Sequence, residues 1–589
     1  MKNMQFNPKY SVLLLFAIVQ TTFAQKDDKD LGTEVVNVVK PYTATISDAF
    51  KVKETPPLDD EETLQKEPIQ YNIFSFPVAS TFTPAKGKAA GVDKTKKEKL
   101  FDNYATLGFG NYGTVIGELF VTENLSRNEY IGGMLRHHSS QGGIEGLDLD
   151  DKFSNTTLDL SYGSLGKDLS WSGDLGFQHQ IYNWYGLPTY FTEGLTPEDK
   201  NLLIGSIDEK QTYYNFYIGG KIALSESFFK YASIKFNRFW DGYDSAENRF
   251  ILKPSFDVAI NDFDINTNVI IDYVGGTFKN GYNDATAIDY GFANFGINPS
   301  FVYNRDDLSM DIGVSVVYSA AQEVDSKLYV YPQITAAYKV VGDLMVFYAG
   351  AEGGLQQNSY RDFTTINPFL SPTLQIRPTD QQYDLFAGLK GKLANNISYN
   401  VRGSMMSEQY KPLFRSNFLE LPVAIGANQS FAYGNSFTLV YDDVNTLSFY
   451  GEVNANLSKN FSFGLNGTFS TYTTDNESEA WNLPTMKLGG NIGVNFTEKW
   501  FAGVDLFLVG SRYDQYIVAS ELDPAFYEFK KVTLDSYFDL NANLGYRHND
   551  RLTGFVRANN ILNQSYEKWF NFPVQQFQIV LGANYKFDF

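Results

Sequence analysis

The chain contains no cysteine and only four histidines. These are His137, His138, His179 and His548 among 589 residues. The lack of cysteine excludes disulfides, thiolate metal sites and cysteine catalysis. The HExxH, P-loop and strand-to-helix G-x-S-x-G motifs of hydrolases and nucleotide-binding proteins are missing as well. We therefore expect a protein that is not an enzyme and that has no cofactor.

Long apolar runs and positive charge are also scarce. After the first 25 residues, no stretch is apolar over the roughly 20 residues that a membrane-spanning helix needs. Charged residues make up 20% of the chain, the net charge is −20 and the mean hydropathy is −0.27. This acidic balance argues against nucleic acid as a partner.

The one apolar run, at the start of the chain, is typical of a signal peptide. Residues 11–19 (SVLLLFAIV) follow Lys2 and Lys9 and precede Thr22-Phe23-Ala24, which resembles a signal-peptidase site. The alternative is a buried N-terminal helix. We expect a signal peptide over residues 1–24 and export of the rest.

Aromatic residues are abundant, and at the end of the chain they alternate with polar residues. There are 49 Phe and 39 Tyr. In residues 576–589 one parity is apolar from Phe577 to Phe589, and the other is largely polar. Successive side chains of a β-strand point to opposite faces, so this segment has one apolar and one wet face. Such a strand fits a soluble β-protein or an outer-membrane barrel whose apolar face meets lipid.

Similar segments recur from about Asn103 onward. We count about 22, among them 444–457 and 531–547, and bacterial membrane barrels have an even number of strands. Compact polar turns mostly alternate along the chain with long loops such as 410–443, with shorter connections at 111–113, 241–246 and 320–325 as exceptions. A soluble sandwich has no reason to place its long loops on one side so often. The sequence therefore predicts an all-β fold, a transmembrane antiparallel β-barrel of about 22 strands over residues 101–589. We expect it in the bacterial outer membrane, with both termini in the periplasm.

The segment before the barrel, residues 25–100, has a different composition. An acidic run follows Pro56-Pro57, and residues 94–99 (KTKKEK) are highly charged. We expect a mostly unstructured periplasmic segment. Its one candidate for order is the valine-rich stretch Glu34, Val35, Val36, Asn37, Val38 and Val39.

The C-terminal part of the chain, roughly residues 360–589, resembles the barrel of TonB-dependent outer-membrane receptors. Residues 556–566 (VRANNILNQSY) are similar to that family's penultimate strand and following loop, and the chain ends similarly in Tyr-Lys-Phe-Asp-Phe. Residues 367–372 (NPFLSP) resemble a mid-barrel loop, and residues 450–453 (YGEV) a descending strand. The resemblance implies uptake of a nutrient or another solute across the outer membrane.

The resemblance also implies an N-terminal plug domain of well over a hundred residues, from which this chain departs. Only about 75 residues lie between the signal peptide and the first strand. We therefore expect a plug that is reduced or missing. Residues 34–39 resemble the TonB-contact segment, and a short β-prone peptide can add to a partner's sheet edge. An ordinary extended valine-rich segment is the alternative. The expected partners are outer-membrane lipid, the barrel-assembly machinery, and TonB or another envelope protein.

Three further sets of residues are candidate sites. The candidate outer-membrane assembly signal consists of Tyr585, Phe587 and Phe589. The aromatics that could stack on a ligand, pack loop on loop or lie in the interfacial girdle are Trp184, Tyr185, Tyr190 and Phe191. The candidates for a divalent-cation site are His137, His138, Asp148 and Asp150. A solvated acidic loop is the alternative for this last set.

Three functions remain open from the sequence. The first is receptor-like uptake, the second a passive or gated pore, and the third a structural or assembly barrel that works with a partner protein. A barrel this wide carries water unless it is filled. The three functions can be distinguished by what fills the barrel. The candidates are residues 25–100, outer loops such as 410–443, and a partner protein.

Overall fold

The computed structural model describes residues 100–188, 195–225, 227–260, 263–282, 284–322, 325–418, 429–519 and 527–589. The predicted signal peptide and the candidate TonB-contact segment 34–39 lie outside these residues. Within them, the dominant element is a single closed sheet of 22 antiparallel strands. The predicted fold class and strand number are therefore confirmed.

The barrel strands, in chain order, are β1 Asn103–Gly110, β2 Val115–Asn124, β3 Glu129–Ser140, β4 Phe153–Leu165, β5 Leu169–Asn183, β6 Lys210–Leu224, β7 Phe229–Asp241, β8 Ala246–Ile260, β9 Phe263–Phe278, β10 Ile288–Arg305, β11 Leu308–Ala321, β12 Lys327–Val341, β13 Met345–Gln356, β14 Thr379–Ala394, β15 Ile397–Ser416, β16 Phe437–Ser458, β17 Phe461–Thr474, β18 Met486–Asn495, β19 Trp500–Val509, β22 Tyr537–Arg547, β23 Leu552–Asn559 and β26 Gln578–Phe587.

Small elements lie in the loops. They are a 3-10 turn at Asn111–Gly113, the helices α2 Pro197–Ile204 and α3 Tyr360–Ile366, and the hairpins β20 Arg512–Ala519 with β21 Tyr527–Leu534 and β24 Glu567–Trp569 with β25 Phe572–Pro573. Among the described residues, no helix is long and apolar enough to cross a membrane.

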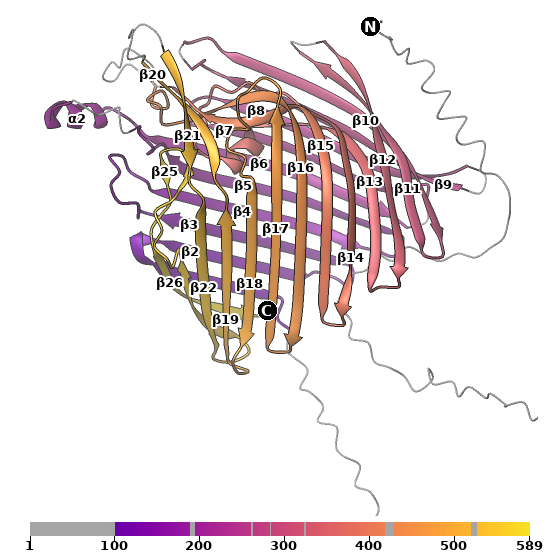
Figure 1. Cartoon of the computed structure of the whole chain (residues 1–589). Coiled ribbons are helices and arrows are strands. Elements are labelled where there is room, and N and C mark those ends of the chain that lie inside the picture. The colour runs from indigo at the N-terminus through magenta and orange to yellow at the C-terminus, as the bar shows by residue number, and fades with distance from the viewer. Residues whose placement is uncertain are drawn as a thin grey trace, which may run out of the picture. The chain divides into compact units, whose positions relative to one another are not determined.

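The barrel closes where its first and last strands meet. β1 pairs with β26 over eight residue pairs, from Asn103 with Phe587 to Gly110 with Val580. In Figure 1 the indigo N-terminal strands accordingly lie beside the yellow C-terminal ones. All neighbouring strands are antiparallel, so an even number is required for this closure. The closed ring leaves no strand edge unpaired.

Alternation along each strand separates an apolar outer surface from a polar lumen. On β26 the outward-facing Ile579, Leu581 and Tyr585 are exposed, whereas Val580 on the inner side is fully buried. The same parity predicted the apolar face of this strand. An exposed, continuous apolar surface of this kind is suited to contact with lipid.

Rings on the lumen side lie across glycines of the neighbouring strand. Tyr217 of β6 is paired with Gly176 of β5, and Phe555 of β23 with Gly582 of β26. At both glycines an added Cβ would overlap the ring. Glycine therefore provides the space in which the ring packs flat on the inner wall.

All of the long connections lie at one end of the barrel, which we call the loop end; β1–β2 and β7–β8 are joined there by short turns. Two predicted boundaries there were wrong. β15 and β16 continue pairing to Ser416 with Phe437, so the predicted loop 410–443 is shorter. The predicted strand 531–547 is divided between β21 and β22, because β20 and β21 pair only with each other and leave the barrel sheet.

Candidate functional site

The loop between β13 and β14 folds into the barrel mouth through helix α3. Ser359 caps the helix, its Oγ accepting from the Asp362 amide at 3.1 Å. The buried Glu247 of β8 accepts hydrogen bonds from the amides of Tyr360 and Arg361 at 2.6 and 3.3 Å. A carboxylate at this position complements the unpaired amides of a helix N-terminus.

A second set of charges holds α3 against the inner wall. Arg249 of β8 binds Asp272 of β9 through two nitrogens, at 3.0 and 2.8 Å, and Asp362 of α3 at 2.7 Å. The Tyr360 hydroxyl donates to Asp241 Oδ2 at 2.8 Å. The helix is thus fixed to the strands by hydrogen bonds and ion pairs. Removing one partner of such a buried pair is destabilising, because the other charge is left buried without a partner.

Phe369, which follows α3, is the point where three loops meet. Its ring stacks on Phe572 of the β23–β26 loop with centroids 4.1 Å apart, and lies 5.4 Å from the ring of Tyr185 in the β5–β6 loop. The three loops are rooted eight, eight and six strands apart around the ring of 22. Segments rooted so far apart can touch only over the lumen. We call this cluster of loops the cap.

The β15–β16 loop joins the cap from the wall opposite the β5–β6 loop. Asn435 donates to the carbonyl oxygen of Trp184 at 3.0 Å, and the rings of Trp184 and Phe431 lie 5.8 Å apart. Ten strands separate the two loops in the ring. A separate apolar cluster includes Tyr213, Phe363 and Phe437, and Phe369 packs against both clusters. Loops of the loop end therefore bridge the mouth of the barrel.

The β20–β21 hairpin is tied to the end of β15 and to the β17–β18 loop by a buried carboxylate. Asp514 accepts hydrogen bonds from the Ser416 amide at 3.0 Å and from Asn482 Nδ2 at 2.8 Å. Burial raises the pKa of Asp514 to about 6. One side chain thus connects β20 with the end of β15 and with the β17–β18 loop.

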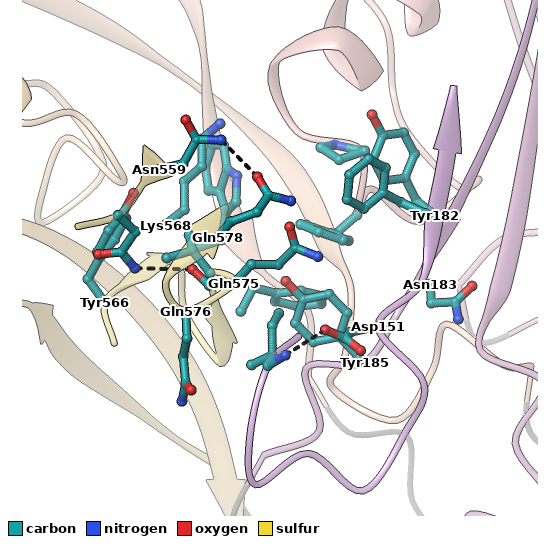
Figure 2. A pocket seen from close by; sticks show the side chains of 18 of the residues that line it. Asp151, Tyr182, Asn183, Tyr185, Asn559, Tyr566, Lys568, Gln575, Gln576 and Gln578 are labelled. Atoms are coloured by element: carbon teal, nitrogen blue, oxygen red, sulfur yellow. Dashed lines mark hydrogen bonds between the residues drawn. The ribbon is translucent and has the colours of Figure 1, made fainter. Parts of the chain in front are cut away.

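A cavity of about 410 Å³ lies between the cap and the inner wall. Figure 2 shows Tyr182 and Tyr185 on one side of it and Asn559, Gln575 and Gln578 on the other. Its size is within the roughly 300–1,000 Å³ of small-molecule sites, and its mixture of aromatic and polar side chains is also typical of them. This cavity is the candidate functional site.

The predicted ligand-stacking aromatics are divided. Trp184 is fully buried and packs loop on loop between Tyr243 and Phe431, whereas Tyr185 lines the cavity and donates its hydroxyl to the Pro573 carbonyl at 2.9 Å. Tyr190 and Phe191 lie outside the described residues. Of the candidate assembly signal, Tyr585 and Phe587 belong to β26, and Phe589 follows it, highly exposed.

The candidate cation ligands have other partners. His137 is hydrogen-bonded to Thr156 and Ser139, Asp148 pairs with Lys200, and Asp150 pairs with Lys152. His138 packs edge-on against the ring of Phe153. In the part of the chain that the structure covers, no three His, Asp or Glu side chains are grouped to hold a metal ion.

Sequence reasoning missed the residues that matter most here. Phe369 lies in the NPFLSP stretch that carried the family resemblance, but nothing in that stretch shows that its ring meets Phe572. Gln576 and Gln578 appeared only as the wet parity of the last strand. Contact across the barrel mouth leaves no local pattern, because the partners lie about 200 residues apart in the chain.

Several solved structures have a similar fold. One is the ferripyoverdine receptor of the Pseudomonas aeruginosa outer membrane, with a TM-score of 0.59 and 13% identity over 83% of this chain and 72% of that one. Another is the Escherichia coli K12 ferric-catecholate import receptor Fiu, with a TM-score of 0.58 and 12% identity over 82% of each chain. A third is the copper transporter OprC, with a TM-score of 0.57 and 12% identity over 82% of this chain and 80% of that one.

All three neighbours are TonB-dependent receptors. The barrel of this chain therefore has the fold of the barrels of TonB-dependent receptors. No protein-family model and no curated protein matches the chain.

Proposed function

We propose that the chain is an outer-membrane receptor barrel that takes up a solute, with loops that close its outer mouth until the solute binds. The observation that carries this proposal is the cap. Loops from three parts of the wall meet at Phe369, directly beside a cavity of small-molecule size. The same fold in a ferripyoverdine receptor, a copper transporter and a ferric-catecholate import receptor supports a role in uptake rather than catalysis.

The location and partners belong to the same proposal. The apolar outer surface favours the outer membrane, and the predicted signal peptide favours export. Residues 34–39 would contact TonB if uptake is energised. The end of the barrel opposite the loop end and both termini would face the periplasm, and the loop end, with the cavity, would face outward.

A gated pore is the second candidate, because the same cap would serve it. The structural or assembly role gains nothing specific from the cap. An open, passive pore is disfavoured, since loops that bridge the mouth obstruct free diffusion.

Planar-bilayer conductance tests the closure of the barrel. We would compare the full chain with a variant lacking residues 26–98. The proposal predicts that both proteins are closed most of the time, because the cap occludes the mouth without help from the N-terminal segment. A large, steady conductance in the shortened variant would contradict closure by the loops.

A further inference from the structure

The lining of the cavity combines amides and aromatic rings with few charged residues. Of its 23 lining residues, seven are amides, seven are aromatic, and the charged ones are two Asp and two Lys. No His or Met lines it, and the chain has no Cys. The lining thus offers neither an excess of one charge nor soft ligands for a metal ion.

The amides are held in place by hydrogen bonds to their neighbours. Asn559 Nδ2 donates to Gln578 Oε1 at 2.8 Å, and Gln578 Nε2 donates to Thr114 Oγ1 at 2.9 Å. Gln575 Nε2 donates to Ser140 Oγ at 2.8 Å. Each bond fixes an amide while the carbonyl oxygens of Asn559 and Gln575 keep their capacity to accept. A preorganised set of acceptors is what a specific polar ligand requires.

Aromatic rings face these amides. Tyr182 and Tyr185 lie across the cavity from Asn559 and Gln575 in Figure 2. Trp569, which also lines the cavity, is buried and its indole nitrogen has no hydrogen-bond partner in the described part of the chain. The same holds for Asn183 Oδ1. Buried polar atoms without partners point to an unseen one, such as water or a ligand.

The two Asp and two Lys of the lining balance each other in formal charge. Burial and the nearby Arg512 lower the pKa of Lys568, and burial raises the pKa of Asp151. Lys152 is already paired with Asp150 outside the lining. An anionic metal chelate would therefore find little net positive charge here.

We propose that this cavity binds an uncharged, hydroxyl-rich ring compound, a carbohydrate of one or two rings. This inference deepens the proposed uptake function and rests on it. Hydroxyl groups both donate and accept, so they match the fixed amides, and the aromatic rings cover the apolar face of a sugar ring. The solute taken up would then differ in chemistry from the metal cargoes named for the three structural neighbours.

Saturation-transfer NMR on the purified full chain tests this. The protein is kept in a detergent without a sugar headgroup and is exposed to a mixture of maltose, cellobiose, lactose and sucrose. Gallium(III) citrate serves as a diamagnetic anionic chelate in a parallel sample. We expect transfer to at least one disaccharide and none to citrate. The variants Gln575→Leu and Asn559→Leu should weaken binding roughly tenfold, as expected for a lost buried hydrogen bond.

The control is Asn466→Leu, which removes an amide on β17 that does not line the cavity and should leave binding unchanged. Heat-modifiable migration on gels verifies that each variant forms a barrel. Absence of transfer to all four sugars, equal binding in Gln575→Leu and Asn466→Leu, or transfer to citrate that disappears in Lys568→Met would each overturn the proposal. Binding needs no transport, so this test can fail while the conductance test still supports a closed uptake barrel.

Discussion

Replacement of Phe572 by alanine should open the cap. Phe572 is 1% exposed and its ring lies 4.1 Å from that of Phe369, 4.9 Å from that of Tyr185 and 5.6 Å from that of Phe437. It therefore contacts the β13–β14 loop, the β5–β6 loop and β16 at once. The variant keeps all of the strand pairing of the barrel, so we expect the loops to separate while the sheet stays intact.

The size of the effect follows from the burial of this ring. Removing a fully buried Phe side chain costs roughly 3–5 kcal/mol. The lower end of this range applies to loops that can partly collapse, and about 3 kcal/mol corresponds to roughly a hundredfold change in the equilibrium between closed and open caps. A cap that opens about once in a thousand conformations would then be open roughly a tenth of the time.

The assay is single-channel recording of the variant lacking residues 26–98, with and without Phe572→Ala. Phe529→Ala is the matched control, since that ring is 61% exposed in β21. Phe572→Leu, which retains most of the apolar volume, should give an intermediate open time. If the open time with Phe572→Ala equals that with Phe529→Ala, the ring does not hold the loops together and the reasoning fails.

Three further predictions concern pH, packing and assembly. The pKa of Asp514 is raised from 3.8 to about 6, which corresponds to about 3 kcal/mol, so anchoring of the β20–β21 hairpin is strongest below about pH 4 and weakens as the pH rises to 6. Amide hydrogen exchange of residues 512–519 and 527–534 should therefore accelerate between pH 5 and pH 7.5 by more than the pH dependence of the intrinsic exchange rate. The same extra acceleration in the Asp514→Asn variant would contradict this. Gly582→Val should reduce the heat stability of the barrel, because the new Cβ would overlap the Phe555 ring and lie 2.6 Å from the Leu107 carbonyl oxygen. Gly451→Val is the control, since an added Cβ there has no atom within 4 Å. Equal melting temperatures of the two variants would refute the packing argument. Phe589→Ser, or deletion of residues 587–589, should lower the amount of heat-modifiable barrel in outer-membrane fractions, and wild-type amounts would show that the terminal aromatics are dispensable.

The barrel could be predicted because its information is local. Each strand alternates apolar and polar residues in a period of two, and turn residues mark its ends, so the count of 22 follows from the chain without any knowledge of distant contacts. One error arose where β15 and β16 continue to Ser416 and Phe437, past the predicted strand ends. The other arose where the polar pair Asp535-Ser536 separates two strands that the alternation pattern reads as one. Pairing with the neighbour, not the residue pattern, decides where such strands begin.

The candidate site was much less predictable. Tyr185 could be named as a loop aromatic from the sequence. That Tyr185 lines the cavity while the adjacent Trp184 is buried depends on which loops lie next to each side chain. The amides Asn559 and Gln575 lie on separate segments and appear unremarkable in the sequence. The pairing of β23 with β26 places Asn559 beside Gln578, and a hydrogen bond to Ser140 holds Gln575 near them.

The sequence by itself determined an all-β chain with an apolar outer face, a wet inner face and an even number of strands, since these depend on residues two positions apart. Only the tertiary structure decided that the mouth is capped, that Phe369 meets Phe572 there, and that a neutral, amide-lined cavity lies beside them. The physical reason is that loop positions follow from contacts across the lumen, between residues that are distant in the chain and that become neighbours only after the barrel has closed.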